Sequence, residues 1–220
     1  MLSEKSEGRQ ILIAIEGPDY TGKSSLIAKL IDLLNDRYSH LARIPAVKVS
    51  RPGGTLQCAP LREKITNSEL PRLTRQAFAL AEEVLFTNTF ETDSPIVIFD
   101  RYNPISGQVY GPVEMRETWQ LAVTREITLQ MDKVLFIQSD KEVIQERFNT
   151  RDKHDVMDSI FADKIDRILH EYEAIRTSDW TQAWCSPSVV CNNGDFDTFV
   201  AEAFKIVCGV IDERYGTIVG

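Results

Sequence analysis

The sequence predicts an α/β fold: one domain with a five-stranded parallel sheet and helices on both faces of that sheet. Short apolar runs alternate along the chain with longer segments whose apolar residues recur at helical spacing, and this alternation is typical of parallel sheets covered by helices. With 220 residues and neither repeats nor linkers, the chain suits a single domain with a large core, residues 1–220. Residues 1–10 are polar and are expected to form a flexible N-terminus.

The first half of the chain is expected to supply three strands. Continuous apolar runs predict buried parallel strands at residues 11–15, 46–50 and 95–99. Periodic apolar residues predict the helices between them, over about 23–38, 56–65 and 73–89. Ligands of such sheets bind at the carboxyl ends of the strands. The loops that follow the three strands are therefore expected to converge on one site, and these loops are residues 17–24, 51–55 and 100–102.

The second half is expected to add two strands, at residues 134–137 and 189–191. Before the first of these the pattern predicts one helix over 113–129. After it, Ser139 and Glu142 have the spacing of a capping box, which predicts the start of another helix. Apolar residues at helical spacing predict two more helices, over about 161–172 and 196–210.

The loop after the first strand carries the clearest chemical signal. Residues 17–24, GPDYTGKS, match the phosphate-loop pattern G-x-x-x-x-G-K-[ST] at each specified position. Gly22 lets the backbone approach a polyphosphate, and the N–H groups at the start of the following helix point at it. Lys23 adds a mobile positive charge, and the Ser24 hydroxyl can hold Mg²⁺. The alternative is a glycine-containing turn that matches by chance, but the strand before and the helix after favour a phosphate site.

The third strand ends in a second candidate group, Asp100 and Arg101. A carboxylate at this place can reach Mg²⁺ beside a phosphate loop, although strand ends also use Asp as a turn former. The planar guanidinium of Arg101 could span two phosphoryl groups, or could form a surface ion pair. The phosphate loop favours the functional interpretation of Asp100.

Residues 147–158 are rich in charge and are expected to form a lid. Arg147 and Arg151 share one face if the helix extends that far, and Lys153 follows. A nucleoside triphosphate together with a phosphorylated acceptor brings about five to six negative charges into one cleft. A basic segment that closes over the site would balance this charge and exclude water. The alternative is an ordinary solvated face.

Composition limits the other possibilities. The chain has 33 acidic and 25 basic residues, a net charge of −8, and no long basic stripe, so a nucleic-acid partner is not expected. The four cysteines have no C-x-x-C spacing, which favours reduced thiols over a metal site or a disulfide framework. No apolar run approaches membrane length, and no signal-peptide pattern is present, so we expect a cytoplasmic protein without membrane contact.

Several separated motifs, taken together, resemble the thymidylate kinase family, a group of P-loop nucleoside monophosphate kinases. Residues 17–25 are similar to its phosphate loop, and residues 51–55, RPGGT, to the R-E-P-G-G-T that follows its second strand. Leu85-Phe86 is similar to an apolar pair of the family. Residues 100–102, DRY, are similar to its D-R-[YHW] signature, and Ser106 with Tyr110 to S-x-x-[AV]-[YF]. The order of these motifs covers roughly residues 11–215.

The resemblance implies a role for each matching residue. Those implied to bind ATP are Gly17, Asp19, Tyr20, Thr21, Gly22, Lys23, Ser24, Ser25 and Asn193. Those implied to bind the acceptor nucleotide are Asp19, Arg51, Phe86, Phe90, Arg101, Ser106 and Tyr110. Ser24 and Asp100 would hold Mg²⁺. The catalytic set would be Lys23, Asp100, Arg101, Arg147, Arg151 and Lys153, with the lid supplying the basic residue that one subtype carries at the position of Tyr20.

The chain also departs from the family pattern. A Glu is missing between Arg51 and Pro52, and Phe90 stands where the family has an Arg that donates to the thymine base. A phenyl ring cannot donate. Either Asn88 or Thr89 replaces that donor, or the acceptor is a modified or different pyrimidine nucleotide.

The resemblance as a whole implies an enzyme that transfers the γ-phosphoryl group of MgATP to a pyrimidine deoxynucleoside monophosphate, above all to dTMP. By the family's habit it also implies a homodimer. The sequence leaves two alternatives open. One is a kinase for a modified pyrimidine nucleotide. The other is a P-loop ATPase that acts as a regulatory switch and has no acceptor.

Overall fold

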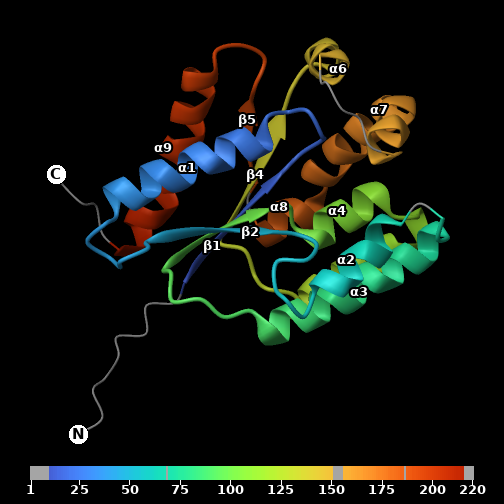
Figure 1. Ribbon diagram of the computed structural model, residues 1–220, viewed down its shortest axis with the longest axis horizontal. Coiled ribbons are helices and arrows are strands. Elements are labelled where there is room, and N and C mark those ends of the chain that lie inside the picture. The colour runs from blue at the N-terminus through green and yellow to red at the C-terminus, as the bar shows by residue number, and fades with distance from the viewer. Residues whose placement is uncertain (1–9, 68, 151–155, 186, 216–220) are drawn as a thin grey trace, which may run out of the picture.

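The computed structural model describes residues 10–67, 69–150, 156–185 and 187–215, without the side chains of residues 156–163. Within these ranges the chain forms one five-stranded sheet (Figure 1). Its strands are β1 (Ile11–Glu16), β2 (Ala46–Ser50), β3 (Ile96–Asp100), β4 (Lys133–Gln138) and β5 (Ser188–Cys191). All pairings are parallel, in the order β2-β3-β1-β4-β5. The predicted α/β class and five-stranded parallel sheet are confirmed.

The central strand β1 is buried on both faces, as its continuous apolar sequence predicts. Ile11, Ile13 and Ile15 belong to one hydrophobic cluster, and Leu12 and Ala14 belong to the other. This alternation follows from the period of two in a strand. Parallel neighbours on each side, β3 and β4, satisfy its backbone groups.

Helices cover both faces of the sheet (Figure 1). On one face lie α1 (Lys23–Arg37) and α9 (Phe196–Tyr215). The cluster on the other face includes side chains from α3 (Arg72–Thr89), α4 (Asn103–Tyr110), α5 (Arg116–Thr124), α6 (Lys141–Asn149), α7 (Val156–Arg176) and α8 (Asp179–Cys185). The short α2 (Ala59–Thr66) has no buried residue and packs against α3. Among the described helices, none combines the length and apolar character needed to cross a bilayer.

The single helix expected over 113–129 is wrong in its second half. A 3₁₀ turn, Val113–Met115, precedes α5, which ends at Thr124. Glu126 takes a left-handed φ of 55°, and the N–H of Ile127 donates to the carbonyl of Ala122. This is the bonding of a Schellman ending. The sequence did not indicate this helix end, because a glutamate occupies the position where glycine is usual.

The expected capping box at Ser139 is also wrong. Asp140 is the N-cap of α6 and its side chain makes no capping bond. The Ser139 hydroxyl instead donates to the carbonyl of Asn192 at 2.8 Å. The hydroxyl therefore joins the ends of β4 and β5, a use that only the neighbouring strand makes possible.

Candidate active site

The phosphate loop joins β1 to α1 at the carboxyl edge of the sheet. Gly22 precedes α1 with a left-handed φ of 86°, and a Cβ there would lie 2.5 Å from Asn192 Nδ2. Only glycine fits both conditions without strain. Ser24 and Ser25 are exposed in the first turn of α1. The exposed hydroxyls and the free N–H groups of that turn together form an anion site.

Lys23 lies inside the loop. Its Nζ donates to the carbonyl of Pro18 at 2.5 Å, and the residue is buried. Burial, followed by the like charge of Arg101, lowers the pKa of Lys23 to about 8. The loop therefore holds a positive charge that is poorly solvated and that a phosphate group would stabilise.

Arg101 connects the phosphate loop to α7. It adopts a left-handed φ of 75° directly after β3. Its guanidinium donates to the Asp19 carboxylate and, at 2.9 Å, to the Tyr172 hydroxyl. Burial opposes the charge of Arg101, but Asp19 and other neighbours raise its pKa well above the ordinary value. Arg101 therefore stays charged at the entrance to the loop, and its guanidinium lies 5.4 Å from the centre of the Tyr110 ring.

Glu16 is a site residue that sequence reasoning missed. It is fully buried at the end of β1, and burial raises its pKa. Its carboxylate accepts from the Tyr102 N–H at 2.5 Å, the Ser106 hydroxyl at 2.8 Å and the Tyr172 hydroxyl at 3.1 Å. An acid at the end of an otherwise apolar strand was the available signal. Glu16 positions the start of α4 and the residues around Arg101.

Arg51 follows β2 and is buried with two carboxylates. Its Nη2 lies 2.8 Å from Glu82 Oε2 and 2.6 Å from Glu83 Oε2. Its guanidinium stacks 3.7 Å above the centre of the Phe86 ring. The Nε and Nη1 atoms are buried and have no hydrogen-bond partner among the described residues. Arg51 therefore keeps its charge and has donors left for a ligand.

A cavity of about 260 Å³ lies beside Asp19, Arg51 and Arg101. We name it the acceptor cavity. Ser106 and Tyr110 of α4 also line it, so five of the residues expected to bind the acceptor meet here. Three further arginines border it, and these are Arg62, Arg72 and Arg75. Among the described residues no carboxylate forms a salt bridge with these three. The cavity is suited to an anionic ligand.

Phe86 and Phe90 are not brought to the acceptor cavity. Phe86 is fully buried and stacks on Phe90 with ring centres 4.8 Å apart. The side chains of α3 that line the cavity are Arg72, Arg75, Gln76 and Ala79. Phe86 lies about 15 Å further along the helix than Gln76, at about 1.5 Å per residue. The departure at Phe90, on which the alternative of a modified acceptor depended, therefore does not alter the lining of the cavity.

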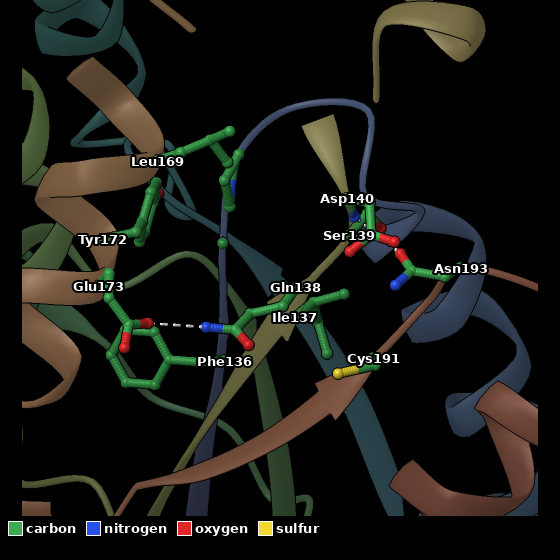
Figure 2. A pocket seen from close by; sticks show the side chains of 12 residues that line it. Phe136, Ile137, Gln138, Ser139, Asp140, Leu169, Tyr172, Glu173, Cys191 and Asn193 are labelled. Atoms are coloured by element: carbon green, nitrogen blue, oxygen red, sulfur yellow. Dashed lines mark hydrogen bonds between the residues drawn. The ribbon is translucent and has the colours of Figure 1, made fainter. Parts of the chain in front are cut away.

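A second cavity of about 230 Å³ borders the phosphate loop at Gly17 and Pro18 (Figure 2). It lies between α7 and the ends of β4 and β5, and the Gln138 amide donates across it to Glu173 at 3.0 Å. Asn193 lines its far side, where Asn193 Oδ1 accepts the N–H of Asp140 at 2.7 Å. Asn193 is thus next to the loop, as expected for a donor-side residue.

Arg147 of α6 also reaches the loop. Its guanidinium donates to the carbonyl of Tyr20 at 3.2 Å and to the carbonyl of Asn192 at 3.1 Å. The prediction that Arg147 and Arg151 share one face was conditional on the helix reaching Arg151, and α6 ends at Asn149. Arg151 and Lys153 lie outside the described residues, as do all of residues 151–155 in the segment expected to form a lid.

Asp100 and Ser24 are the oxygen donors expected for Mg²⁺. Asp100 Oδ2 lies 2.8 Å from Lys48 Nζ, and its charge acts on Lys23. Within the part of the chain that the structure describes, no cluster of three or more His, Cys, Asp or Glu could hold a metal by itself. Mg²⁺ usually takes one or two protein ligands and completes its shell with phosphate oxygens and water. A carboxylate and a hydroxyl beside a phosphate loop fit that requirement.

Comparisons with known proteins agree with this geometry. The family model described as thymidylate kinase matches residues 15–182. The structure resembles the thymidylate kinase of Ehrlichia chaffeensis with a TM-score of 0.63 and 16% identity, covering 90% of this chain and 98% of that one. It resembles the thymidylate kinase of Candida albicans with a TM-score of 0.63 and 17% identity, covering 94% and 93%. No curated protein sequence matches. The extent of the family match, over a sheet and phosphate loop of the corresponding fold, shows that this chain belongs to the thymidylate kinase family of ATP-dependent nucleoside monophosphate kinases.

Proposed function

We propose that this enzyme transfers the γ-phosphoryl group of MgATP to dTMP and forms dTDP. Membership of the family supports the reaction. The environment of Arg51 is the main support for a nucleoside monophosphate as the acceptor. A buried donor without a partner costs about 1–3 kcal/mol, and Arg51, a residue that lines the acceptor cavity, has two such nitrogens. The phosphate oxygens of a nucleoside monophosphate would satisfy both.

The phosphate loop would form the binding site for the phosphate donor, ATP. The backbone N–H groups from Gly17 to Ser25 would bind the β- and γ-phosphates, and Lys23 would exchange the Pro18 carbonyl for a phosphate oxygen. Ser24 and Asp100 would hold Mg²⁺, which neutralises charge on the phosphate oxygens when it is bound with ATP. Asn193 lies at the edge of this region and would contact the donor nucleoside.

Phosphoryl transfer depends mainly on how the two nucleotides are positioned and on cations near the migrating group, and less on proton transfer. An ionised acceptor phosphate is already a nucleophile, so the reaction is an in-line displacement without a covalent enzyme intermediate. Lys23 and Arg101 would stabilise the charge on the migrating group. Asp19 now holds the Arg101 guanidinium and would help to orient it toward the acceptor. Arg147, Arg151 and Lys153 would add the cations of a lid over residues 147–158.

The proposal includes a homodimer, which follows from the family resemblance. It also includes a cytoplasmic location and the absence of a nucleic-acid partner, which follow from the sequence composition. Light scattering after size exclusion, at several protein concentrations, tests for the homodimer. A mass of one chain at every concentration contradicts a stable dimer.

The function is tested by incubating the purified protein with MgATP and, one at a time, dTMP, dUMP, dCMP and dGMP, and by separating the products chromatographically. We expect dTDP and ADP in equal amounts. The Lys23→Met variant, purified in the same way, controls for contaminating kinases. ADP release that does not depend on any acceptor would instead indicate an ATPase switch.

A further inference from the structure

Gln76 lines the acceptor cavity from α3 and has an unusual partner. Its side chain is 7% exposed, and its Oε1 accepts a hydrogen bond from the indole Nε1–H of Trp119 at 3.1 Å. Trp119 is completely buried in α5. The contact therefore joins a cavity-lining amide to the core behind it.

This contact determines which end of the Gln76 amide is available. An indole N–H can only donate, so its partner must be the amide oxygen. The reversed amide would place two donors against each other. The Nε2 group makes no hydrogen bond with any described residue. Gln76 therefore has a free NH₂ donor and an oxygen that is already in use.

Gly107 of α4 and Gly111, the residue that follows this helix, leave the space for this pair. A Cβ on Gly107 would lie 2.3 Å from Trp119 Nε1, and a Cβ on Gly111 would lie 2.9 Å from Gln76 Cδ. Side chains at either position would force the indole and the amide apart. Gly107 also lines the acceptor cavity, so the pair lies behind the part of α4 that carries Ser106 and Tyr110.

The polar side chains that α3 presents to the cavity offer mainly hydrogen-bond donors. The lining side chains of α3 are Arg72, Arg75, Gln76 and Ala79, and arginine has no acceptor atom. The polar side chains further along α3 do not contribute. Asn88 Nδ2 donates to the carbonyl of Val84 at 2.7 Å, and the Thr89 hydroxyl donates to that of Leu85 at 2.8 Å. Neither of them lines the cavity.

We propose that Gln76 reads the acceptor base, and that Trp119 is the positioning residue that makes this reading selective. The Gln76 NH₂ donates to a carbonyl oxygen on the edge of the pyrimidine. A keto base such as thymine or uracil offers that oxygen at C4, whereas cytosine presents an amino group there. The enzyme therefore discriminates dTMP from dCMP through α3. This inference rests on the proposed function and specifies the substrate class of the same site.

The test measures kcat/KM for dTMP and for dCMP with saturating MgATP. In Gln76→Glu one carboxylate oxygen still accepts from Trp119, but the other now faces the base as an acceptor. We expect the dTMP:dCMP ratio to fall by about 100-fold, with the KM for ATP unchanged. Gln57→Glu makes the same chemical change at an exposed position outside the cavity and should leave the ratio as in the wild type.

A second variant keeps the cavity lining intact. Trp119→Phe removes the N–H that orients the amide, so Gln76 can present either end. The ratio should fall by about 10-fold, through the KM of the nucleotides rather than through kcat. Loss of stability alone would lower both activities equally and leave the ratio unchanged. The variant remains informative if Gln76→Glu fails to fold.

The outcomes separate the two proposals. A wild-type enzyme that phosphorylates dTMP well, with the same dTMP:dCMP ratio in both variants, overturns the role of Gln76 and leaves the proposed function intact. A wild-type preference for dCMP also overturns it, although phosphoryl transfer stands. If the wild-type protein phosphorylates no nucleotide, the proposed function fails and this inference fails with it.

Discussion

Arg51 and Glu83 form an ion pair with 2.6 Å between Nη2 and Oε2, and both side chains are completely shielded from solvent. Glu82 shares the same guanidinium nitrogen. Burial raises the pKa of Glu83, and Arg51 opposes this effect. The acceptor cavity is therefore bordered by a cation that the fold cannot lose without leaving buried carboxylates uncompensated.

Arg51→Met should impair both stability and acceptor binding. It leaves Glu82 and Glu83 buried without a cation, so the free energy of unfolding should fall by about 3–5 kcal/mol in urea titrations. Glu83→Gln is the matched control, because Arg51 keeps Glu82 and the change should be much smaller. Arg51→Lys keeps the positive charge but lacks the planar array of N–H donors of a guanidinium, so the KM of this variant for dTMP should rise at least about tenfold. A KM unchanged in Arg51→Lys contradicts the assigned role.

Lys23→Ala should lower turnover by about 10²–10³-fold, since a cation positioned at a transferring phosphoryl group is worth several kcal/mol. The fold should remain intact, because the buried Lys23 charge is itself unfavourable. Lys29→Ala removes an exposed lysine of the same helix and serves as the control. Steady-state rates and urea unfolding midpoints are compared for the wild type, Lys23→Ala and Lys29→Ala. Near-normal turnover in Lys23→Ala would refute its role.

The affinity for MgATP should depend on pH through Lys23. Its pKa is about 8 in the folded protein against an ordinary 10.5. Its positive charge is therefore lost as pH rises through 8, and the affinity for the anionic ligand should weaken by up to about tenfold per unit above that pH. Calorimetric titrations with MgATP measure this change, at roughly pH 7.5 to 9.5, a range that spans the Lys23 pKa of about 8. Lys23→Arg, which stays charged, should remove the dependence. A constant wild-type affinity across the window would show that Lys23 does not titrate there.

Glu16→Ala should destabilise the protein by about 3–5 kcal/mol, because it leaves the buried donors of Tyr102, Ser106 and Tyr172 without an acceptor. Ser106→Ala removes one of these donors and should cost only about 1 kcal/mol. Urea unfolding of both variants gives the comparison. Equal losses in the two variants would mean that Glu16 is not the centre of this network.

Much of the fold could be read from local patterns. Five apolar runs predicted five strands, and residues 17–24 predicted the phosphate loop, because a strand, a glycine turn and a helix start depend on neighbouring residues alone. The loops after β1, β2 and β3 were expected to converge, and Asp19, Arg51 and Arg101 do line one cavity. That expectation required only that parallel strands end at one edge.

Local sequence was enough to identify the charged residues and the order in which the strands carry them, since both depend on short stretches of chain. The face of α3 that meets the acceptor cavity depends on tertiary packing, which places Gln76 there and not Phe86 or Phe90. Tertiary packing also gave Arg51 its two buried carboxylates and Glu16 its donors. Those contacts join residues far apart in the chain, and they arise from the packing of helices on the sheet, which no local pattern encodes.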